Sequence, residues 1–147
     1  MELHGFAGRS LDELRSLAPE GCTLLHVCPP EELTLQADPV LLRNILNNLL
    51  SNAIKYSPHG GSVTLRTWHD DQSVTLEVTD QGIGIPKEDQ ARLFQSFHRA
   101  GNTAGIRGTG LGLVILKHAV DLHGGEVDFW SEVGQGSRFT VRLPRQP

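Results

Sequence analysis

The chain has 147 residues, with 13 basic and 17 acidic side chains and a formal net charge of −4. This length fits a single domain over residues 1–147 that can bury a hydrophobic core. A net negative charge without a Lys/Arg cluster argues against a nucleic-acid partner, and no apolar run reaches the roughly 18 residues of a membrane-spanning helix.

The cysteine content and the first residues suggest an intracellular setting. Cys22 and Cys28 are too few for a disulfide framework or a zinc site, and we interpret them as ordinary core or strand thiols. The opening segment, MELHGFAGRS, lacks the basic start and apolar stretch of a signal peptide. We therefore expect a cytoplasmic protein, whether or not a longer parent protein is anchored in a membrane.

The N-terminal part is predicted to contain a helix and two short strands. Ser10-Leu11-Asp12-Glu13 fits a capping box, with serine at the N-cap and glutamate three residues later. It predicts a short helix that Pro19 ends. Apolar segments at 22–27 and 33–37 predict strands on either side of a Pro-Pro turn.

The middle of the chain predicts a long helix and then two strands. Asp38-Pro39 supplies an N-cap acceptor and a proline at the first helical position, and the helical pattern continues to Tyr56. Segments 62–69 and 73–80 alternate apolar and polar residues, which predicts two strands. The connection at 70–72 has the length of a hairpin turn.

The C-terminal part predicts two more helices and a closing hairpin. In order, its features are a helix from Pro86 to Phe97, a polar glycine-rich stretch at 99–108, a helix at 110–123 ended by Gly124-Gly125, and strands at 126–131 and 137–143. Because most strands come in hairpins, the order predicts an α/β fold, a two-layer sandwich of one mixed sheet with about three helices on one face.

One face of the predicted helix at 39–56 is rich in amides. At about 100° per residue, Leu and Ile cover one half of the helix, whereas Asn44, Asn48, Asn52 and Lys55 form a stripe on the other. A solvated face usually carries Glu, Lys, Arg and Gln, which favour helices more than Asn does. A solvated face and a ligand-binding face both fit this pattern, and an amide oxygen suits Mg²⁺ already held by phosphates.

Asp80 ends a predicted strand and begins the sequence Asp-Gln-Gly-Ile-Gly. Glycine at positions 82 and 84 would allow positive φ and close approach by a flat ligand. A carboxylate only accepts hydrogen bonds, so Asp80 would select adenine, whose amine donates where guanine has an acceptor. The alternative is an ordinary turn without a ligand, because Asp and Gly are common turn residues.

A second glycine run, Gly108, Gly110 and Gly112, surrounds the start of the last predicted helix. It follows a polar loop rather than a strand and lacks the Gly-Lys-Ser/Thr of a Walker A loop. A helix N-terminus of this kind favours phosphate, and Arg99 and Arg107 could close over an anion. The alternative is a flexible connection followed by close helix packing.

The order of these motifs resembles the ATP-binding catalytic domain of bacterial two-component sensor histidine kinases, which have the Bergerat fold. LLSNAIKYS resembles the N box, DQGIGI the G1 box, LFQSFHR the F box and GTGLGL the G2 box. The ending, HGGEVDFWSEVGQGSRFTVRLP, is similar to the closing hairpin of that family. The resemblance covers nearly the whole chain.

The resemblance implies an Mg²⁺-ATP site covered by a flexible lid. Asn52 would coordinate Mg²⁺, Asp80 would hold the adenine amine and Arg99 would contact the γ-phosphate. The implied catalytic residues are Asn48, Asn52, Lys55 and Arg99. The implied ATP-binding residues are Asn48, Asn52, Lys55, Tyr56, Asp80, Gly82, Gly84, Ile85, Phe97, Arg99, Arg107, Gly108, Thr109, Gly110, Leu111 and Gly112.

The resemblance also implies transfer of the γ-phosphate to a histidine on a separate dimerisation domain, with a response regulator downstream. None of the seven histidines lies in a motif like His-Glu-Leu-Arg-Thr-Pro. We therefore expect a monomeric catalytic fragment that does not autophosphorylate alone.

Three alternatives share these motifs: an ATPase of the same superfamily, an anti-sigma-type serine kinase and a non-catalytic ATP-binding regulatory module. Related ATPases use a glutamate at the place of Asn48 to activate water. Because an amide cannot take the proton, we expect slow hydrolysis.

Overall fold

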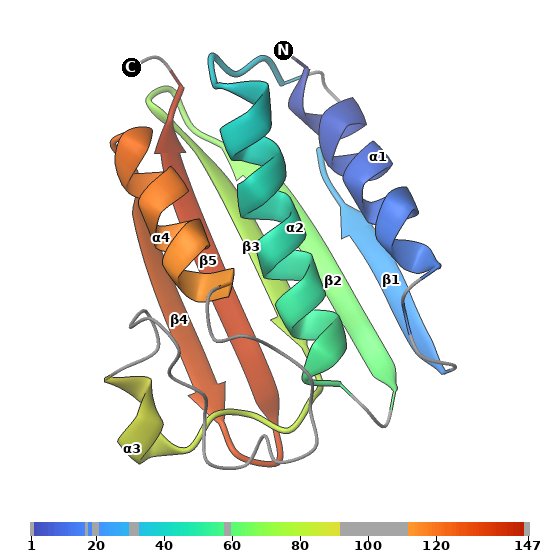
Figure 1. The fold of residues 1–147 in the computed structure, drawn as a ribbon. Helices are drawn as coiled ribbons and strands as arrows, with labels where there is room; N and C mark the ends of the chain where they lie inside the picture. The colour runs from blue at the N-terminus through green and yellow to red at the C-terminus, as the bar shows by residue number, and fades with distance from the viewer. Residues whose placement is uncertain are drawn as a thin grey trace.

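The computed structural model describes residues 2–16, 18, 21–29, 33–57, 60–91 and 112–145. These residues form four helices and five strands, which Figure 1 shows in chain order. The elements are α1 (Leu3–Arg15), β1 (Cys22–Val27), α2 (Pro39–Lys55), β2 (Gly61–His69), β3 (Ser73–Asp80), α3 (Lys87–Gln90), α4 (Gly112–Leu122), β4 (Glu126–Glu132) and β5 (Gly136–Pro144).

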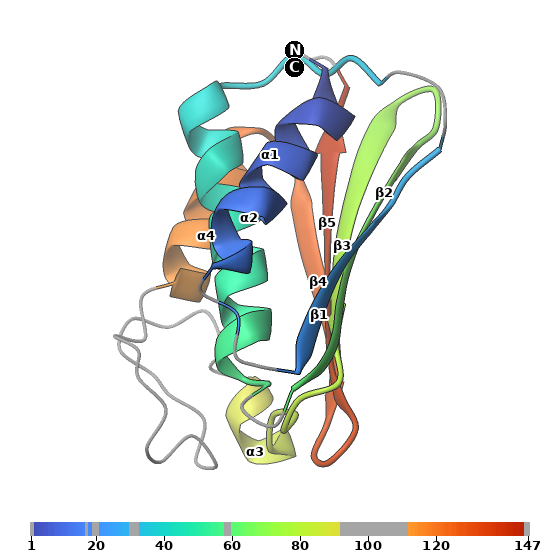
Figure 2. The same cartoon turned by 90° about the vertical axis from the view of Figure 1, so that its right-hand side faces the viewer.

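The five strands form one mixed sheet with the order β1-β2-β3-β5-β4. The β1–β2 pair is parallel and the other three pairs are antiparallel. The long helices α1, α2 and α4 all lie on one face of this sheet, as the edge-on view in Figure 2 shows. The predicted two-layer α/β sandwich is therefore confirmed.

Helix α2 matches its prediction within one residue at each end. The Asp38 carboxylate accepts hydrogen bonds from Val40 N at 2.8 Å and Leu41 N at 3.3 Å, so it caps the first turn. The buried side chains of the helix are those of the predicted apolar half, namely Leu42, Ile45, Leu46, Leu49, Leu50, Ala53 and Ile54. They form the centre of the core between the sheet and the helices.

The predicted start of the first helix is wrong. Helix α1 begins at Leu3, where the Glu2 carboxylate accepts from His4 N at 3.1 Å and Gly5 N at 2.8 Å. Ser10 lies inside the helix and is buried rather than acting as an N-cap. Glu2 can serve as the N-cap in place of the usual shorter residues because its carboxylate also accepts a hydrogen bond from Leu33 N at 3.1 Å, which fixes the side chain.

The predicted strand at 33–37 is also wrong. This segment makes one isolated bridge, between Thr34 and Glu2, and Leu33 O accepts from Leu3 N at 2.7 Å. Leu33 and Leu35 are nevertheless buried, so the apolar pattern that suggested a strand reflects packing next to α1.

The two later helices are confirmed in the parts that the structure describes. Helix α3 covers only Lys87–Gln90, and the predicted continuation to Phe97 lies outside the described residues. Helix α4 ends as predicted at Gly124, which has φ +72°, and Gly125 N donates to Val120 O at 3.0 Å. Among the described residues, no helix is both long and apolar enough to cross a membrane.

Candidate functional site

The polar stripe of α2 is only partly exposed to solvent. Asn44, Asn48 and Asn52 are half-buried, whereas Lys55 is exposed in the last turn. The Asn48 amide donates from Nδ2 to Asn44 O at 2.7 Å, which leaves its Oδ1 as a free acceptor among the described residues. Neither Asn52 nor Lys55 has a side-chain hydrogen bond or ion pair to a described residue. Within the described part of the chain, these polar groups thus have free capacity for hydrogen bonds.

The end of α2 is bonded to the turn that follows β3. Ile83 N donates to Tyr56 O at 2.9 Å. Gly82 packs so closely against the same carbonyl that a Cβ atom at this position would overlap it. The last turn of α2, which ends at Lys55, and the end of β3 at Asp80 thus lie at the same end of the molecule (Figure 1).

Asp80 is the last residue of β3 and lies on the buried face of this strand. Val74, Leu76 and Val78 alternate along the strand and are buried beneath the helices, and Asp80 has the same parity. Only 6% of Asp80 is exposed. Its Oδ1 accepts from Gly82 N at 2.9 Å and Ser137 N at 3.2 Å, whereas no described residue donates to Oδ2. One carboxylate oxygen is therefore fixed by the backbone and the other is left for a donor.

The buried position changes the titration of Asp80. Burial raises the pKa of the Asp80 carboxyl to about 6, against the opposing effect of the N–H groups of Gly82 and Ser137. The group is still mainly ionised at pH 7. It is consequently a charged acceptor held in a desolvated place, where a donor from a ligand would be bound strongly.

The predicted role of the two glycines is partly wrong. Gly84 has φ +74°, as predicted, but Gly82 does not adopt a positive φ. A Cβ at Gly84 would overlap the carbonyl oxygen of Glu132, just as one at Gly82 would overlap that of Tyr56. Both glycines allow close approach of protein backbone, so their close approach to a ligand stays a prediction.

The β4–β5 hairpin holds the other side of this turn. Ile85 N donates to Ser131 Oγ at 2.8 Å, and Gly134 N donates to Ile83 O at 3.0 Å. The two hydroxyls of Ser131 and Ser137 lie 2.8 Å apart. Neither serine was predicted, because the relation of Ser137 to Asp80 depends on the pairing of β3 with β5, and that of Ser131 on the pairing of β4 with β5, and neither has a local signal.

Asn47 is a further polar residue of α2 that was not predicted as part of the polar stripe. It is half-buried on α2, and its Oδ1 is buried without a hydrogen-bond partner among the described residues. Such orphaned acceptors are rare in folded proteins. The Asn-Asn pair at 47–48 was the available signal, because both positions adjoin Asn44 and Ser51 on a helical wheel.

Several predicted site residues lie outside the described part of the chain. They are Phe97, Arg99, Arg107, Gly108, Thr109, Gly110 and Leu111. Gly112, the last glycine of the predicted G2 box, is the first residue of α4. Helix α4 packs beside α2, and the two run in opposite directions (Figure 1).

The described residues fit an adenine nucleotide with Mg²⁺. The neutral amide oxygens of Asn48 and Asn52 are suitable ligands for a hard cation that phosphates already hold. Lys55 adds a positive charge nearby, and the buried carboxylate of Asp80 offers an acceptor to an amine. Together these residues can offer a hydrogen-bond acceptor to a base, and amide groups and a positively charged side chain to phosphates.

Comparison with known proteins shows the family to which this chain is similar. Residues 37–147 match the family described as histidine kinase-, DNA gyrase B-, and HSP90-like ATPase. The chain is 49% identical over 113 residues, or 76% of its length, to the circadian input-output histidine kinase CikA of Synechococcus elongatus. The match with CikA covers 15% of that protein.

Solved structures show the same fold. A mycobacterial sensor histidine kinase, MprB, matches the whole chain with a TM-score of 0.87 at 30% identity, and 98% of the MprB chain is covered. Full-length ShkA, solved in complex with AMPPNP, matches 98% of the chain with a TM-score of 0.84 at 30% identity, although only 30% of ShkA is covered.

The chain therefore belongs to the histidine kinase-, DNA gyrase B- and HSP90-like ATPase family, as an ATP-binding domain of the sensor histidine kinase type. This confirms the resemblance found in the sequence. The chain spans only a small part of its longer relatives.

The raised pKa of Asp80 predicts a specific dependence of stability on pH. Between pH 4 and 6 the unfolded chain has already lost the Asp80 proton while the native state retains it, so native stability falls as pH rises through this window. The difference between 3.8 and about 6 corresponds to about 3 kcal/mol at about 1.36 kcal/mol per pKa unit. Asp80→Asn keeps the Oδ1 acceptor without the charge, so at pH 7.5 it should unfold at higher urea concentration than the wild type.

Urea unfolding of both proteins between pH 4 and 8 measures this effect. The advantage of Asp80→Asn should grow by about 1–3 kcal/mol between pH 4 and 7 and then remain constant. A constant difference across the whole range would show that the carboxyl has an ordinary pKa in the native state. Asp71→Asn, a change at an exposed aspartate, serves as the control and should not alter the pH profile.

Proposed function

We propose that this chain binds Mg²⁺-ATP and transfers the γ-phosphate to a histidine on a separate dimerisation domain, in two-component signal transduction. The proposal rests on the buried carboxylate of Asp80, of which only Oδ1 accepts hydrogen bonds from described residues. The turn that follows Asp80 is hydrogen-bonded to the amide-rich end of α2. The complex of the related ShkA with AMPPNP supports nucleotide binding at this fold.

In this proposal Asp80 recognises adenine. Backbone N–H groups occupy Oδ1, so the adenine amine would donate to Oδ2. Guanine presents an acceptor at the same place and would face the carboxylate without a hydrogen bond. Because charge-assisted hydrogen bonds contribute about 1.5–3 kcal/mol, this contact alone gives a clear preference for ATP over GTP.

The end of α2 would bind the phosphates. Asn52, and Asn48 one turn earlier, would hold Mg²⁺ through their amide oxygens, and Lys55 would contact phosphate. The Mg²⁺ ion, when bound, neutralises negative charge on the triphosphate. Tyr56 and Ile85 would flank the base, with Gly82 and Gly84 shaping the turn beneath it.

The remaining proposed contacts come from the predicted lid. Phe97 would pack at its base and Arg99 would contact the γ-phosphate. Residues 107–112, including Thr109 and Leu111, would bring the end of the lid to the phosphates at the start of α4. Catalysis would then rest on positioning and charge, without a protein base in this chain.

Asn48 favours phosphoryl transfer to a protein over hydrolysis. Its Nδ2 donates to Asn44 O, and an amide oxygen does not take up the proton of an attacking water. ATP would therefore persist until a histidine of the dimerisation domain arrives. We further propose a cytoplasmic location and a response regulator that accepts the phosphate afterwards.

Phosphate transfer in trans tests the proposed function. The chain is incubated with Mg²⁺, ATP labelled on its γ-phosphate and the dimerisation domain of the parent kinase. The label should appear on that domain in an acid-labile, alkali-stable form, as phosphohistidine requires. Alkali-labile phosphoserine would favour the serine kinase, release of ADP that Asn48→Ala abolishes would favour the ATPase, and binding without turnover would favour the regulatory module.

Removing the charge of Asp80 should weaken adenine recognition. Asp80→Asn is expected to reduce ATP affinity by about 10- to 100-fold, because the variant amide can direct its own donor at the adenine amine. The preference for ATP over GTP should shrink with it. Calorimetric titration with each nucleotide measures both effects, and unchanged ATP affinity in the folded variant would remove adenine recognition from Asp80.

Removing the amide of Asn52 should remove the contribution of the metal. Wild-type affinity for ATP should rise when Mg²⁺ is added, whereas Asn52→Ala should bind equally with and without Mg²⁺. Asn44→Ala, two turns earlier on the same stripe, is the matched control and should keep the Mg²⁺ effect. If Asn52→Ala also keeps it, the assignment of Asn52 as a metal ligand is wrong.

A further inference from the structure

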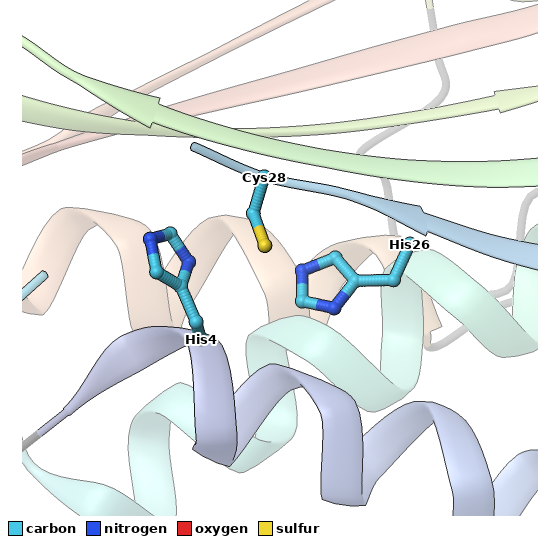
Figure 3. Close-up of side chains that lie close together, drawn as sticks. All are labelled: His4, His26 and Cys28. Carbon is cyan, nitrogen blue, oxygen red and sulfur yellow. The ribbon is translucent and has the colours of Figure 1, made fainter. Parts of the chain in front are cut away.

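Two histidines and a cysteine gather at the edge of the sheet. His4 lies in the first turn of α1, His26 lies in β1, and Cys28 follows the end of that strand. Figure 3 shows the two imidazoles on either side of the Cys28 thiol. One possible ligand atom from each residue lies within 4.8 Å of the other two.

The fold brings these side chains together on the inner face of the sheet. Leu24 is buried under the helices, and His26 and Cys28 follow it at alternate positions. The main chain of His4 is held by Glu2. The Glu2 carboxylate accepts a hydrogen bond from His4 N at 3.1 Å and another from Leu33 N. The cluster is therefore built from a capped helix end and a paired strand.

The hydrogen bonds of the two imidazoles are incomplete. His4 Nδ1 lies 3.1 Å from Thr67 Oγ1, on the adjacent strand β2. His4 Nε2 and His26 Nε2 are both buried, and neither has a hydrogen-bond partner among the described residues. A buried polar nitrogen without a partner is costly, and each of the two histidines has one, so their place beside the Cys28 thiol calls for an explanation.

We propose that His4, His26 and Cys28 bind a borderline transition-metal ion, Zn²⁺ in the first instance, at a site separate from the nucleotide site. Imidazole nitrogen and thiolate sulfur are the usual zinc ligands, whereas Mg²⁺ prefers oxygen. Three protein ligands leave a fourth tetrahedral position for water. The Cys28 thiol gives its proton to the solvent when the sulfur binds the metal.

The geometry requires a small adjustment. Zinc bonds of about 2.0–2.3 Å place neighbouring tetrahedral ligands about 3.3–3.6 Å apart, so the three atoms must approach one another by about 1 Å. Cys28 is exposed and lies beyond the last residue of β1, where backbone pairing does not restrain it.

Metal titration of the untagged chain, kept reduced with a phosphine, tests the site. Calorimetry should show one Zn²⁺ per chain, and the midpoint of thermal unfolding should rise with Zn²⁺ concentration, since the native state alone has the assembled ligands. Co²⁺ in place of Zn²⁺ should give a thiolate-to-metal charge-transfer band. The absence of saturable binding of either metal would overturn the proposal.

Matched variants assign the ligands. Cys28→Ser should abolish the charge-transfer band and weaken Zn²⁺ binding by about 10-fold or more, since loss of even an outer-shell partner costs roughly 10- to 100-fold. His26→Asn should weaken binding similarly. The controls Cys22→Ser and His118→Asn should keep both the band and the affinity. Binding that survives Cys28→Ser and His26→Asn unchanged would place the metal elsewhere and contradict the proposal.

Discussion

The hydrogen bond from Ile83 N to Tyr56 O holds the last turn of α2 against the turn that leaves β3. Gly82 makes this contact possible, because any side chain there would overlap the Tyr56 carbonyl oxygen. The helix brings Asn48, Asn52 and Lys55 to this end of the molecule, and the strand brings Asp80. Two chemically different groups, the amides that we propose bind phosphates and the acid that we propose binds the base, therefore depend on one backbone junction for their relative position.

The carboxylate at this junction, Asp80, destabilises the folded state. Burial raises the pKa of Asp80 to about 6, so keeping the carboxylate ionised at neutral pH opposes folding. The N–H groups of Gly82 and Ser137 offset part of that cost, and both act on Oδ1. A fold selected only for stability would favour an amide at this position. A buried, half-satisfied acid is instead typical of a residue retained for binding.

The features that follow from local pattern were predictable from the sequence. The seven buried side chains of α2 repeat at helical spacing, and the apolar alternation of β3 places Asp80 at its end. The features that depend on distant parts of the chain were not. The contact of Gly82 joins a turn to the distant end of α2, and the bond from Ser137 to Asp80 follows from strand pairing. The start of α1 follows from the bond between Glu2 and Leu33. The cluster of His4, His26 and Cys28 joins residues that have no common motif.

The central claim is that the end of α2 and Asp80 belong to one nucleotide site. A crystal structure of the chain with a non-hydrolysable ATP analogue and Mg²⁺ tests it most directly. We expect the adenine amine to lie within hydrogen-bond distance of Asp80 Oδ2, and the amide oxygen of Asn52 to coordinate Mg²⁺ on the same nucleotide. A bound nucleotide whose base does not touch Asp80, or whose metal lies away from α2, would contradict it.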